Sequence, residues 1–582
     1  MKRWFKQHDA LPLWLATALA AVLFAVLYWQ SAVPSGARIP PASSAYLLSG
    51  QQGRRELPVS APLAENKDIY DLDANIYDVY ISVFPTEDQE GNLLDFSCFG
   101  LLTSQDQDDN PTLDCNIQIL PEGQIPDPLL DLDEENASIR VRGNTSRDAP
   151  YKNYRVQLKE GAKPFFGQKV LNLNKDYYDT SKLGAKLSTD LLAGIDNVLS
   201  YRTYFTRLWI RDASGPLEEQ EFEYQGLYVE LEQPNRAYLK ARGLDENASL
   251  YKARDFTFTP NSALRDVDDP EYSRDAFEEV LGIREGGGSH RKLLEMLEAV
   301  NDPARNFEEV FAEYFNEENY LTWLAFNLLL RHEDILNHNF LLYSPENSKT
   351  WYFMHWDFDD GLRFGIFEGN QPESLQGVQK LLMVKLHRRY FQIPGNLDKL
   401  DAKMQELLTT SITRERVQAL IQTYKPVLLR TLTESPDLGT LRCPPEQLIP
   451  YLDSLYDGIL DSYESFKVSS QYPFSAFVAM PARTEDGAVR FAWDPFFSPK
   501  FLPVTYTIQI YTDYDRKNLV REVTGLRQTS YLMEEGLPDG TYYLLISGVD
   551  SEGWEQISLE HTEGWEGDVF YYKDGLLKFT LE

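Results

Sequence analysis

The chain has 582 residues and a formal net charge of −34, with 90 acidic side chains against 56 basic ones. Its length suits several domains of about 150 residues each, and a hydrophobic content of 43% excludes a wholly disordered chain. So negative a chain argues against a nucleic-acid partner, because a phosphate backbone would repel it. Cys98, Cys115 and Cys443 are too few for a disulfide scaffold or a four-cysteine zinc site. One pair is still able to form a disulfide bond, but free thiols are the simpler interpretation.

Residues 11–29 form an apolar run without a charge, and three basic residues precede it. At about 1.5 Å per residue this run is long enough to cross a hydrocarbon layer of about 30 Å. Basic residues that flank a membrane span usually stay on the cytoplasmic side. The sequence therefore predicts that residues 1–30 are a short cytoplasmic N-terminus followed by a transmembrane helix. We therefore expect a single-pass protein of the cell membrane with its later domains outside. Secretion after signal cleavage is the alternative, but the apolar run is longer than a signal peptide usually has.

Residues 31–66 are rich in Pro, Ser, Gly and Ala, which is typical of a linker. Alternating apolar residues then predict a series of strands. These strands are expected at 76–84, 138–143, 152–158, 205–210 and 226–232. Between the strands, residues 181–193 carry leucines at helical spacing, with Asp179 or Thr180 as the helix cap.

From residue 274 to residue 470 the apolar period becomes helical, with its longest run at 307–330. One short pair of strands interrupts this region, at 340–343 and 350–356. The expected fold class is therefore α+β, with a β-rich lobe followed by a helical lobe over residues 67–470.

The last part of the chain, residues 473–582, again alternates as short strands do. A Leu-Pro-x-Gly-Thr-x-Tyr segment that ends at Tyr543 is similar to the fibronectin type III module, in which a Trp fills the β-sandwich and a Tyr makes a corner hydrogen bond. Trp493 and Tyr543 are expected in these two roles. Another small β-sandwich is the alternative, and either would serve as a spacer or a binding module.

Polar residues are dense between residues 332 and 361, among apolar elements. One hypothesis is a zinc site made by His332, His338 and His355 with Asp357. His332 and His338 are six positions apart, whereas a helical two-His motif needs four, so their rings would diverge on a helix. Ligands from a loop remain open, but a histidine in such a loop is more often a hydrogen-bonded structural residue.

The second hypothesis for this segment is phosphoryl transfer. Protein kinases place a catalytic Asp and, five residues later, an Asn on one loop, and a second Asp then binds the metal. Asp334, Asn339 and Asp357 have this order, with a hairpin between the last two. Asp357 and Asn339 would supply the hard oxygen ligands that Mg²⁺ prefers, and Asp334 would accept the proton of the substrate hydroxyl. Asp359 or Asp360 would share a second ion; a solvated acidic loop is the alternative.

A kinase also needs cations for the nucleotide phosphates, and residues 138–158 offer them. Strand alternation places Arg140 and Arg142 on one face, and Arg155 on the polar face of the next strand. If the two strands form a hairpin, three guanidinium groups line one surface beside the turn at 143–146. Such a surface suits a triphosphate, although an ordinary amphipathic hairpin has the same pattern.

Together these segments resemble the CotH family of secreted or spore-coat atypical protein kinases. The resemblance is carried by residues 142–146, Tyr154-Arg155, Gly226-Leu227-Tyr228 with Glu232, residues 334–339 and residues 356–359. It implies a kinase-like fold, ATP with Mg²⁺ or Mn²⁺, and phosphorylation of Ser in protein substrates. It also implies that Asp334 is catalytic and that Asp357, Asn339 and Asp359 bind the metal. The nucleotide-binding residues expected from it are Arg142, Asn144, Arg155, Glu232 and Trp351, the last as a partner for adenine.

The sequence thus predicts a membrane-anchored, outward-facing kinase that transfers the γ-phosphate of ATP to Ser or Thr of surface or coat proteins. The acidic chain favours a basic, Ser-rich protein substrate. Because ATP is scarce outside cells, a catalytically silent surface adhesin or scaffold with a kinase-like domain is the alternative.

Overall fold

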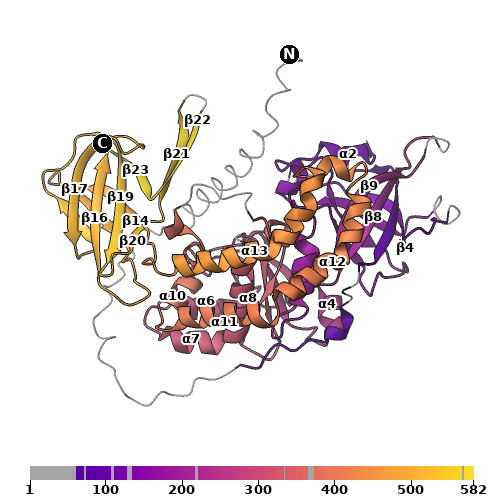
Figure 1. Ribbon diagram of the computed structural model, residues 1–582, viewed down its shortest axis with the longest axis horizontal. Coiled ribbons are helices and arrows are strands. Elements are labelled where there is room, and N and C mark those ends of the chain that lie inside the picture. Colours follow the sequence, from indigo (N-terminus) through magenta and orange to yellow (C-terminus); the bar gives the residue numbers. More distant parts are fainter. Residues whose placement is uncertain are drawn as a thin grey trace.

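The computed structural model places a β-barrel and a β-sandwich at opposite ends of the molecule, with helices between them (Figure 1). It describes residues 60–70, 72, 74–88, 90–106, 110–127, 134–216, 220–332, 334–364, 372–566 and 569–582. The predicted membrane segment at 11–29 lies outside these residues. Within them, no helix combines the length and the apolar character that a membrane crossing requires.

The first lobe is a closed barrel in which strands β1 and β8 pair in parallel and the other neighbours are antiparallel. Its order is β1-β4-β5-β6-β7-β9-β8. The strands are β1 (Ile76–Val83), β4 (Leu113–Pro121), β5 (Ala137–Arg142), β6 (Asn153–Leu158), β7 (Val170–Asn174), β8 (Thr203–Asp212) and β9 (Glu223–Glu232). All strands predicted from residue 76 to residue 232 are present, because alternating apolar side chains fill the barrel interior.

Short elements precede the barrel strands or connect them along the chain. They are η2 (Lys67–Ile69), β2 (Thr86–Glu87), β3 (Leu93–Leu94), α2 (Ser97–Leu101), η3 (Thr145–Asp148) and α3 (Gly184–Leu192). The predicted helix at 181–193 is α3, but it begins only at Gly184 and its N-cap is Leu183, not Asp179 or Thr180. Asp179 still accepts a hydrogen bond from the backbone N–H of Gly184 at 2.7 Å. All three cysteines are free thiols, as the sequence favoured.

A second sheet of order β11-β10-β12-β13 lies between the barrel and the helices. Its strands are β10 (Ser249–Ala253), β11 (Leu281–Glu285), β12 (Phe340–Ser344) and β13 (Tyr352–His355). Leu342 and Phe353 on one face belong to the helical core, whereas Leu341 and Met354 on the other face pack in a cluster with Leu231 of the barrel. The second face therefore looks toward the barrel. We call the boundary between the two lobes beside this face the cleft.

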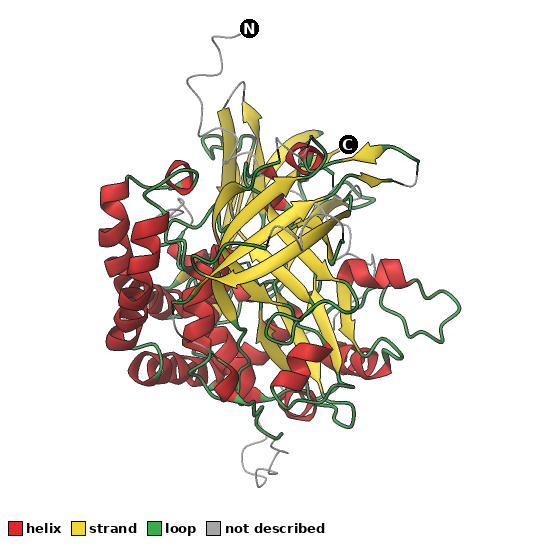
Figure 2. Ribbon diagram, turned by 90° about the vertical axis from the view of Figure 1, so that its right-hand side faces the viewer, coloured by secondary structure: helices red, strands yellow, loops and turns green. Residues whose placement is uncertain are grey.

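The second lobe is mainly helical, as expected (Figure 2). Its elements are α4 (Arg236–Ala241), α5 (Arg274–Val280), α6 (Arg291–Asn301), α7 (Phe307–Tyr314), α8 (Glu317–Leu329), η5 (Phe358–Asp360), η6 (Glu373–Leu375), α9 (Val378–Leu381), α10 (Lys385–Phe391), α11 (Asn396–Thr410), α12 (Arg414–Thr431), η7 (Asp437–Thr440) and α13 (Pro445–Ser469).

Two details differ from the predicted helical region. The run at 307–330 is two helices, because Asn316 is extended and its side chain caps α8 by accepting from the N–H of Asn319. Residues 281–285, expected to be helical, form strand β11 instead. This strand pairs with β10 and is the edge of the second sheet.

The C-terminal part is a β-sandwich whose two sheets enclose one core. Its strands are β14 (Val478–Arg483), β15 (Val489–Trp493), β16 (Val504–Tyr511), β17 (Leu519–Leu526), β18 (Ser530–Met533), β19 (Gly540–Asp550), β20 (Glu555–Ile557) and β23 (Leu576–Leu581). A separate hairpin of β21 (His561–Glu566) and β22 (Val569–Asp574) projects from it (Figure 1).

Trp493 fills the sandwich core as predicted, but the expected role of Tyr543 is wrong. Its neighbour Tyr542 points into this core and donates a hydrogen bond to the carbonyl oxygen of Pro538 at 2.9 Å. Tyr543 packs in a separate small cluster on the other side of β19. Since side chains alternate along a strand, an error of one position moves a residue to the opposite face.

At both ends of the predicted domain 67–470, neighbouring residues outside it also pack against it. The segment 60–66, which we call the strap, was expected to be linker, yet Leu63 is buried and its N–H bonds Oδ1 of Asn197 at 2.5 Å. Ala61 accepts a hydrogen bond from Tyr352 of β13 at 2.7 Å. At the other edge, Phe474 lies in the core of the helical lobe, and Ala476 is the first residue in the sandwich core.

Candidate active site

Asp334 and Asn339 lie in the loop between α8 and β12. The side-chain nitrogen of Asn339 donates to Oδ2 of Asp334 at 2.9 Å. Asn339 enters β12, and the first pair of the hairpin joins Phe340 to His355. The hairpin therefore returns Asp357 to the end at which Asn339 starts, as the sequence predicted.

The backbone around these residues is held in unusual conformations. Asn339 and Asp357 both have left-handed φ angles, of 57° and 62°. His332 contacts the carbonyl oxygen of Asp357 through Nε2 at 2.7 Å, while its Nδ1 contacts Oδ1 of Asn327 at 3.1 Å. Left-handed conformations of non-glycine residues cost energy and gather at functional sites, where surrounding contacts keep them.

Asp334 forms an ion pair with His338, with 2.6 Å between Oδ1 and Nε2. Burial lowers the pKa of His338, but the hydrogen bond and the charge of Asp334 outweigh burial and raise it above its ordinary value. Conversely, burial raises the pKa of Asp334, and His338 more than offsets this, so the carboxyl is more acidic than usual. Both groups are therefore held in their charged forms.

The zinc hypothesis fits these contacts poorly. Both ring nitrogens of His332 contact an oxygen of Asn327 or Asp357, and His338 contacts Asn337 and Asp334 in the same way. Within the described residues, no group of three or more His, Cys, Asp or Glu side chains is arranged so that it could hold a metal ion by itself. Any cation bound here would therefore need further oxygen ligands from its partner or from water.

Asp176 is a site residue that sequence reasoning missed. It follows β7 with a left-handed φ of 47°, and neither carboxylate oxygen has a hydrogen-bond partner although both are buried. Burial, with the charges of Asp179 and Asp357, raises the pKa of Asp176 to about 7. The only sequence signal was an acidic residue directly after a buried strand.

Arg142 is brought to the acidic residues from the barrel. It donates a hydrogen bond to Oδ1 of Asn174, and its charge interacts with Asp357, Asp359 and Asp176. Burial lowers the pKa of Arg142, and these carboxylates act in the opposite direction. Asp359 thus lies within the electrostatic reach of Arg142, as does Asp357.

Arg155 lies in the same cleft, further from the carboxylates. It faces Arg140 directly across the β5–β6 pair, so the predicted hairpin is present with both guanidinium groups on one face. Its Nη1 donates to Oε1 of Gln233 at 2.9 Å. Lys252 of β10, also missed from the sequence, faces the cleft from the second sheet, and its charge interacts with Asp357 and Asp334.

Trp351 lies away from these residues, whereas the expected nucleotide contact of Asn144 stays a prediction. Trp351 is fully buried in the helical core, where it packs beside Tyr251 with Lys292 Nζ 5.4 Å from its ring centroid. It lies at the opposite end of β13 from Asp357, so this structure offers no open ring face for adenine. Asn144 is exposed at the start of η3, and its side chain makes no cap hydrogen bond.

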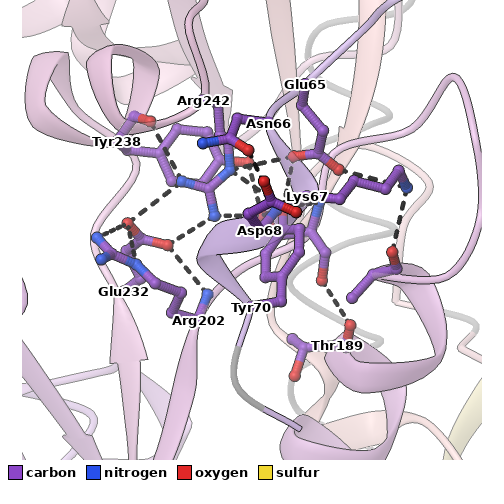
Figure 3. Close-up of polar contacts among 12 residues, drawn as sticks. Glu65, Asn66, Lys67, Asp68, Tyr70, Thr189, Arg202, Glu232, Tyr238 and Arg242 are labelled. Atoms are coloured by element: carbon purple, nitrogen blue, oxygen red, sulfur yellow. Dashed lines mark hydrogen bonds and ion pairs between the residues drawn. The ribbon is translucent and has the colours of Figure 1, made fainter.

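Glu232 also differs from the expected role, because two arginines occupy its carboxylate (Figure 3). Arg202 and Arg242 approach it to 2.5 and 2.7 Å, and Arg242 also meets Glu65 of the strap at 3.3 Å. Burial raises the pKa of Glu232, but the two arginines outweigh it and lower the pKa below its ordinary value. Glu232 therefore joins β9, α4 and the strap as part of the fold.

The comparisons with known proteins agree with this arrangement. The family model described as CotH kinase protein matches residues 139–441, which include the hairpin, the cleft and the acidic loop. The inner spore coat protein H of Bacillus subtilis (strain 168) is 24% identical over 321 residues, which are 54% of this chain and 83% of that protein. A solved Fn3-like protein from Clostridium thermocellum covers 15% of this chain and 83% of its own, with 17% identity and a TM-score of 0.12, too low to define a common fold. Since the family model spans more than half of the chain, the protein belongs to the CotH kinase protein family.

Proposed function

We propose that this chain is an ATP-dependent and Mg²⁺-dependent protein kinase that phosphorylates Ser or Thr of surface or coat proteins. The observation that carries the proposal is the bond from Asn339 to Asp334, formed beside Asp357 and next to the cations Arg142 and Lys252. Enzymes that transfer phosphoryl groups position their charged reactants with carboxylate, amide and basic side chains of this kind.

The donor set fits a hard divalent cation. Asp357 and the unpartnered Asp176 offer carboxylate oxygens, and the amide nitrogen of Asn339 is used by Asp334, which leaves its carbonyl oxygen for the cation. Asp359, whose charge also acts on Arg142, would be a further ligand. A bound cation would neutralise charge on the phosphate oxygens. It would also favour the charged form of Asp176, whose pKa is raised by burial and, to a lesser extent, by the charges of Asp179 and Asp357.

In the proposed reaction the hydroxyl oxygen of the acceptor attacks the γ-phosphorus of ATP. The bond from this phosphorus to the β,γ-bridging oxygen breaks, so ADP leaves and a phosphate monoester forms. Asp334 orients the hydroxyl and takes its proton. His338 and Asn339 hold the two oxygens of Asp334 in place, which limits the positions that the acceptor can take.

The test measures ATP affinity and phosphate transfer on the same preparations. Asp334→Asn should bind ATP with Mg²⁺ as the wild type does but lose transfer by roughly 10²–10⁴, the usual worth of positioned acid–base help. Asp357→Asn is the contrasting control and should lose the metal-dependent part of ATP affinity. Equal transfer by wild type and Asp334→Asn would exclude the catalytic role. Absence of transfer from both would favour the catalytically silent adhesin or scaffold.

The location is also a proposal. The name of the Bacillus subtilis relative refers to the inner spore coat, and the apolar run at 11–29 favours a membrane anchor with an outward-facing kinase. An outward-facing kinase would need ATP outside the cell. A basic, Ser-rich protein is the substrate class that an acidic chain favours.

A further inference from the structure

A cavity of about 460 Å³ lies between α6 and the loop that follows β10. Pro260 and Leu264 line it from the loop, and Leu294 and Leu297 line it from one face of α6. Leu264 and Leu297 are buried, whereas Leu294 is only partly buried. The cavity, which we call the α6 groove, therefore has an apolar floor, and none of these residues belongs to the site around Asp334.

The loop is tied to α6 at both ends of the helix, so the groove is held open in the folded protein. At the end of α6, the side-chain nitrogen of Asn301 donates to the carbonyl oxygen of Phe258 at 2.9 Å. At its start, Asp266 accepts from the N–H of His290 at 2.6 Å and pairs with Arg291 at 2.7 Å. Since α6 has 11 residues, these ties are about 16 Å apart. This is the length of about five residues of an extended peptide.

The end of the groove at the C-terminus of α6 is acidic. Glu298 and Asp302 line it there, and the last carbonyl groups of the helix add a partial negative charge. In the part of the chain that the structure describes, neither carboxylate forms an ion pair, although Asp302 accepts a hydrogen bond from the N–H of Ala304 at 2.8 Å. Arg389 also reaches this end and donates to the backbone carbonyl oxygens of Val300 and Asp302. The two carboxylates therefore favour a cation from a partner.

The loop that lines the groove starts at the loop that carries Asp334. The N–H of Phe256 donates to the carbonyl oxygen of Asn337 at 2.7 Å, and the side chain of Asn337 donates to Oδ1 of Asp255 at 2.7 Å. Asn337 stands three residues after Asp334. Pro260 stands four residues after Phe256. At no more than about 3.6 Å per residue, Pro260 is within roughly 30 Å of Asp334, which about ten residues of an extended chain span.

We propose that the α6 groove binds a short apolar and basic segment of a partner protein. Apolar side chains of this segment would lie on the leucines of the floor, and a Lys or Arg would pair with Glu298 and Asp302. A second copy of this chain is a poorer occupant, because both copies carry a net charge of −34. The identification of the partner as the phosphorylated protein rests on the proposed function. The groove would then hold this protein while its Ser or Thr reaches Asp334.

The experiment measures binding of the full chain to arrays of short synthetic peptides, in EDTA and without ATP. Peptides of Leu and Arg should bind, whereas peptides of Leu and Glu or of Ser and Arg should not. Glu298→Lys should weaken binding of the best Leu and Arg peptide by about tenfold, because it reverses one charge at the groove. Glu295→Lys is the matched control: Glu295 is on the same helix, is 55% exposed, contacts Lys349 at 3.8 Å and does not line the groove. Its affinity should stay within about twofold of the wild type.

Leu294→Ala tests the apolar floor and should also weaken binding of this peptide, because a contact surface is lost. Thermal unfolding of each variant shows whether its fold is intact. Equal binding of all three kinds of peptide would overturn the proposal. So would an affinity for the Leu and Arg peptide that neither Glu298→Lys nor Leu294→Ala changes. Self-association of the wild type that Glu298→Lys abolishes, measured by light scattering, would assign the groove to a second copy instead.

Phosphate transfer separates this inference from the proposed function. The best Leu and Arg peptide is joined to a Ser through a flexible spacer of about ten residues. The wild type should phosphorylate this peptide with a lower KM than the same Ser peptide without the docking segment. Glu298→Lys should raise this KM and leave kcat unchanged, because the groove is remote from the reacting atoms. If the peptide binds at the groove but ATP gives no transfer, the groove stands and the kinase proposal fails. If transfer occurs but no peptide binds at the groove, the groove is wrong and the kinase proposal stands.

Discussion

His338 and Asp334 keep each other charged, and this sets their dependence on pH. The folded-state pKa of His338 is raised above its unfolded value of about 6.5, so the stabilisation by the pair is complete below that pH and is lost as pH rises through the folded-state pKa. For Asp334 the pKa is lowered, so its contribution is present above the unfolded value of about 3.9 and is lost as pH falls through the folded-state pKa.

Asp334→Asn should therefore lower the pKa of His338 to below its ordinary value. Without the carboxylate, burial of the ring and the charge of Lys252 both oppose protonation. Titration of the histidine ring signals by NMR measures this, and it needs no catalytic activity. His290, which contacts Tyr251 at 2.8 Å in another part of the lobe, should titrate as before. An unchanged pKa for His338 would show that the ion pair does not form in solution.

Site residues that depend on local order were predictable, and those that depend on distant packing were not. Asp334, Asn339 and Asp357 follow from spacing and one hairpin. The structural role of Glu232 depends on Arg242 and on Glu65, which is far away in the sequence. The expected contact of Trp351 with adenine is not supported, because residues far apart in the sequence bury its ring in the helical core, and no local pattern reports that.

Strand β9 carries a bulge at which the barrel is tied to the helical lobe. Gly226 has a φ of 101°, and a Cβ there would collide with Lys175 Nζ and Asp437 Oδ1. These two groups form a buried ion pair at 2.6 Å, and Asp437 also accepts from the N–H of Leu227 at 2.9 Å. The bulge therefore needs glycine both for its backbone and for the space above it.

Gly226→Ala should destabilise the protein by about 3 kcal/mol or more, because it strains the backbone and disturbs a buried ion pair. The free energy of unfolding from denaturant titration measures this. Gly243→Ala is the matched control, since Gly243 has a φ of 71° but no atom within 4 Å of its added Cβ. It should cost only the backbone strain of about 1–2 kcal/mol. Equal costs for the two variants would mean that the ion pair adds nothing.

Elements with a clear apolar period could be predicted from the sequence. Element boundaries that depend on a single residue could not. Strands β1, β5, β6, β8 and β9 of the barrel alternate and were predicted, whereas β4 and β7 were not. The break between α7 and α8 rests on Asn316, whose capping role competes with a continuous helical pattern. Strand β11 is short and follows α5 directly. It is a strand because it pairs with β10, which lies far from it in the sequence.

The whole molecule consists of a kinase-like part with the sandwich attached on the side of α9 and α10. Arg388 of α10 donates to the carbonyl oxygen of Ser475 at 3.2 Å, and Gln556 of β20 donates to that of Ser374 at 2.5 Å. The cleft residues lie on other elements, in the barrel and the second sheet.

A chain that ends at Ser475 should therefore bind ATP with an affinity within about twofold of the full chain, because no cleft residue is lost. Calorimetry with ATP and Mg²⁺ checks this. Ending after Ser475 keeps Phe474 in the helical core, whereas a chain that ends at Ser470 removes it and should unfold at a lower temperature. A large loss of ATP affinity in the longer truncation would mean that the sandwich shapes the cleft.

The strap bears on how the kinase-like part would respond to mechanical load. The backbone N–H of Leu63 donates a hydrogen bond to Asn197 of the first lobe. Figure 3 shows that Glu65 pairs with Arg242, which in turn pairs with Glu232 at the passage from β9 to α4. Tension applied through the preceding chain would therefore reach these contacts before it reached the hairpin with Asp357. Under such a load the contacts of the strap would therefore break before the contacts around Asp357 carried the force.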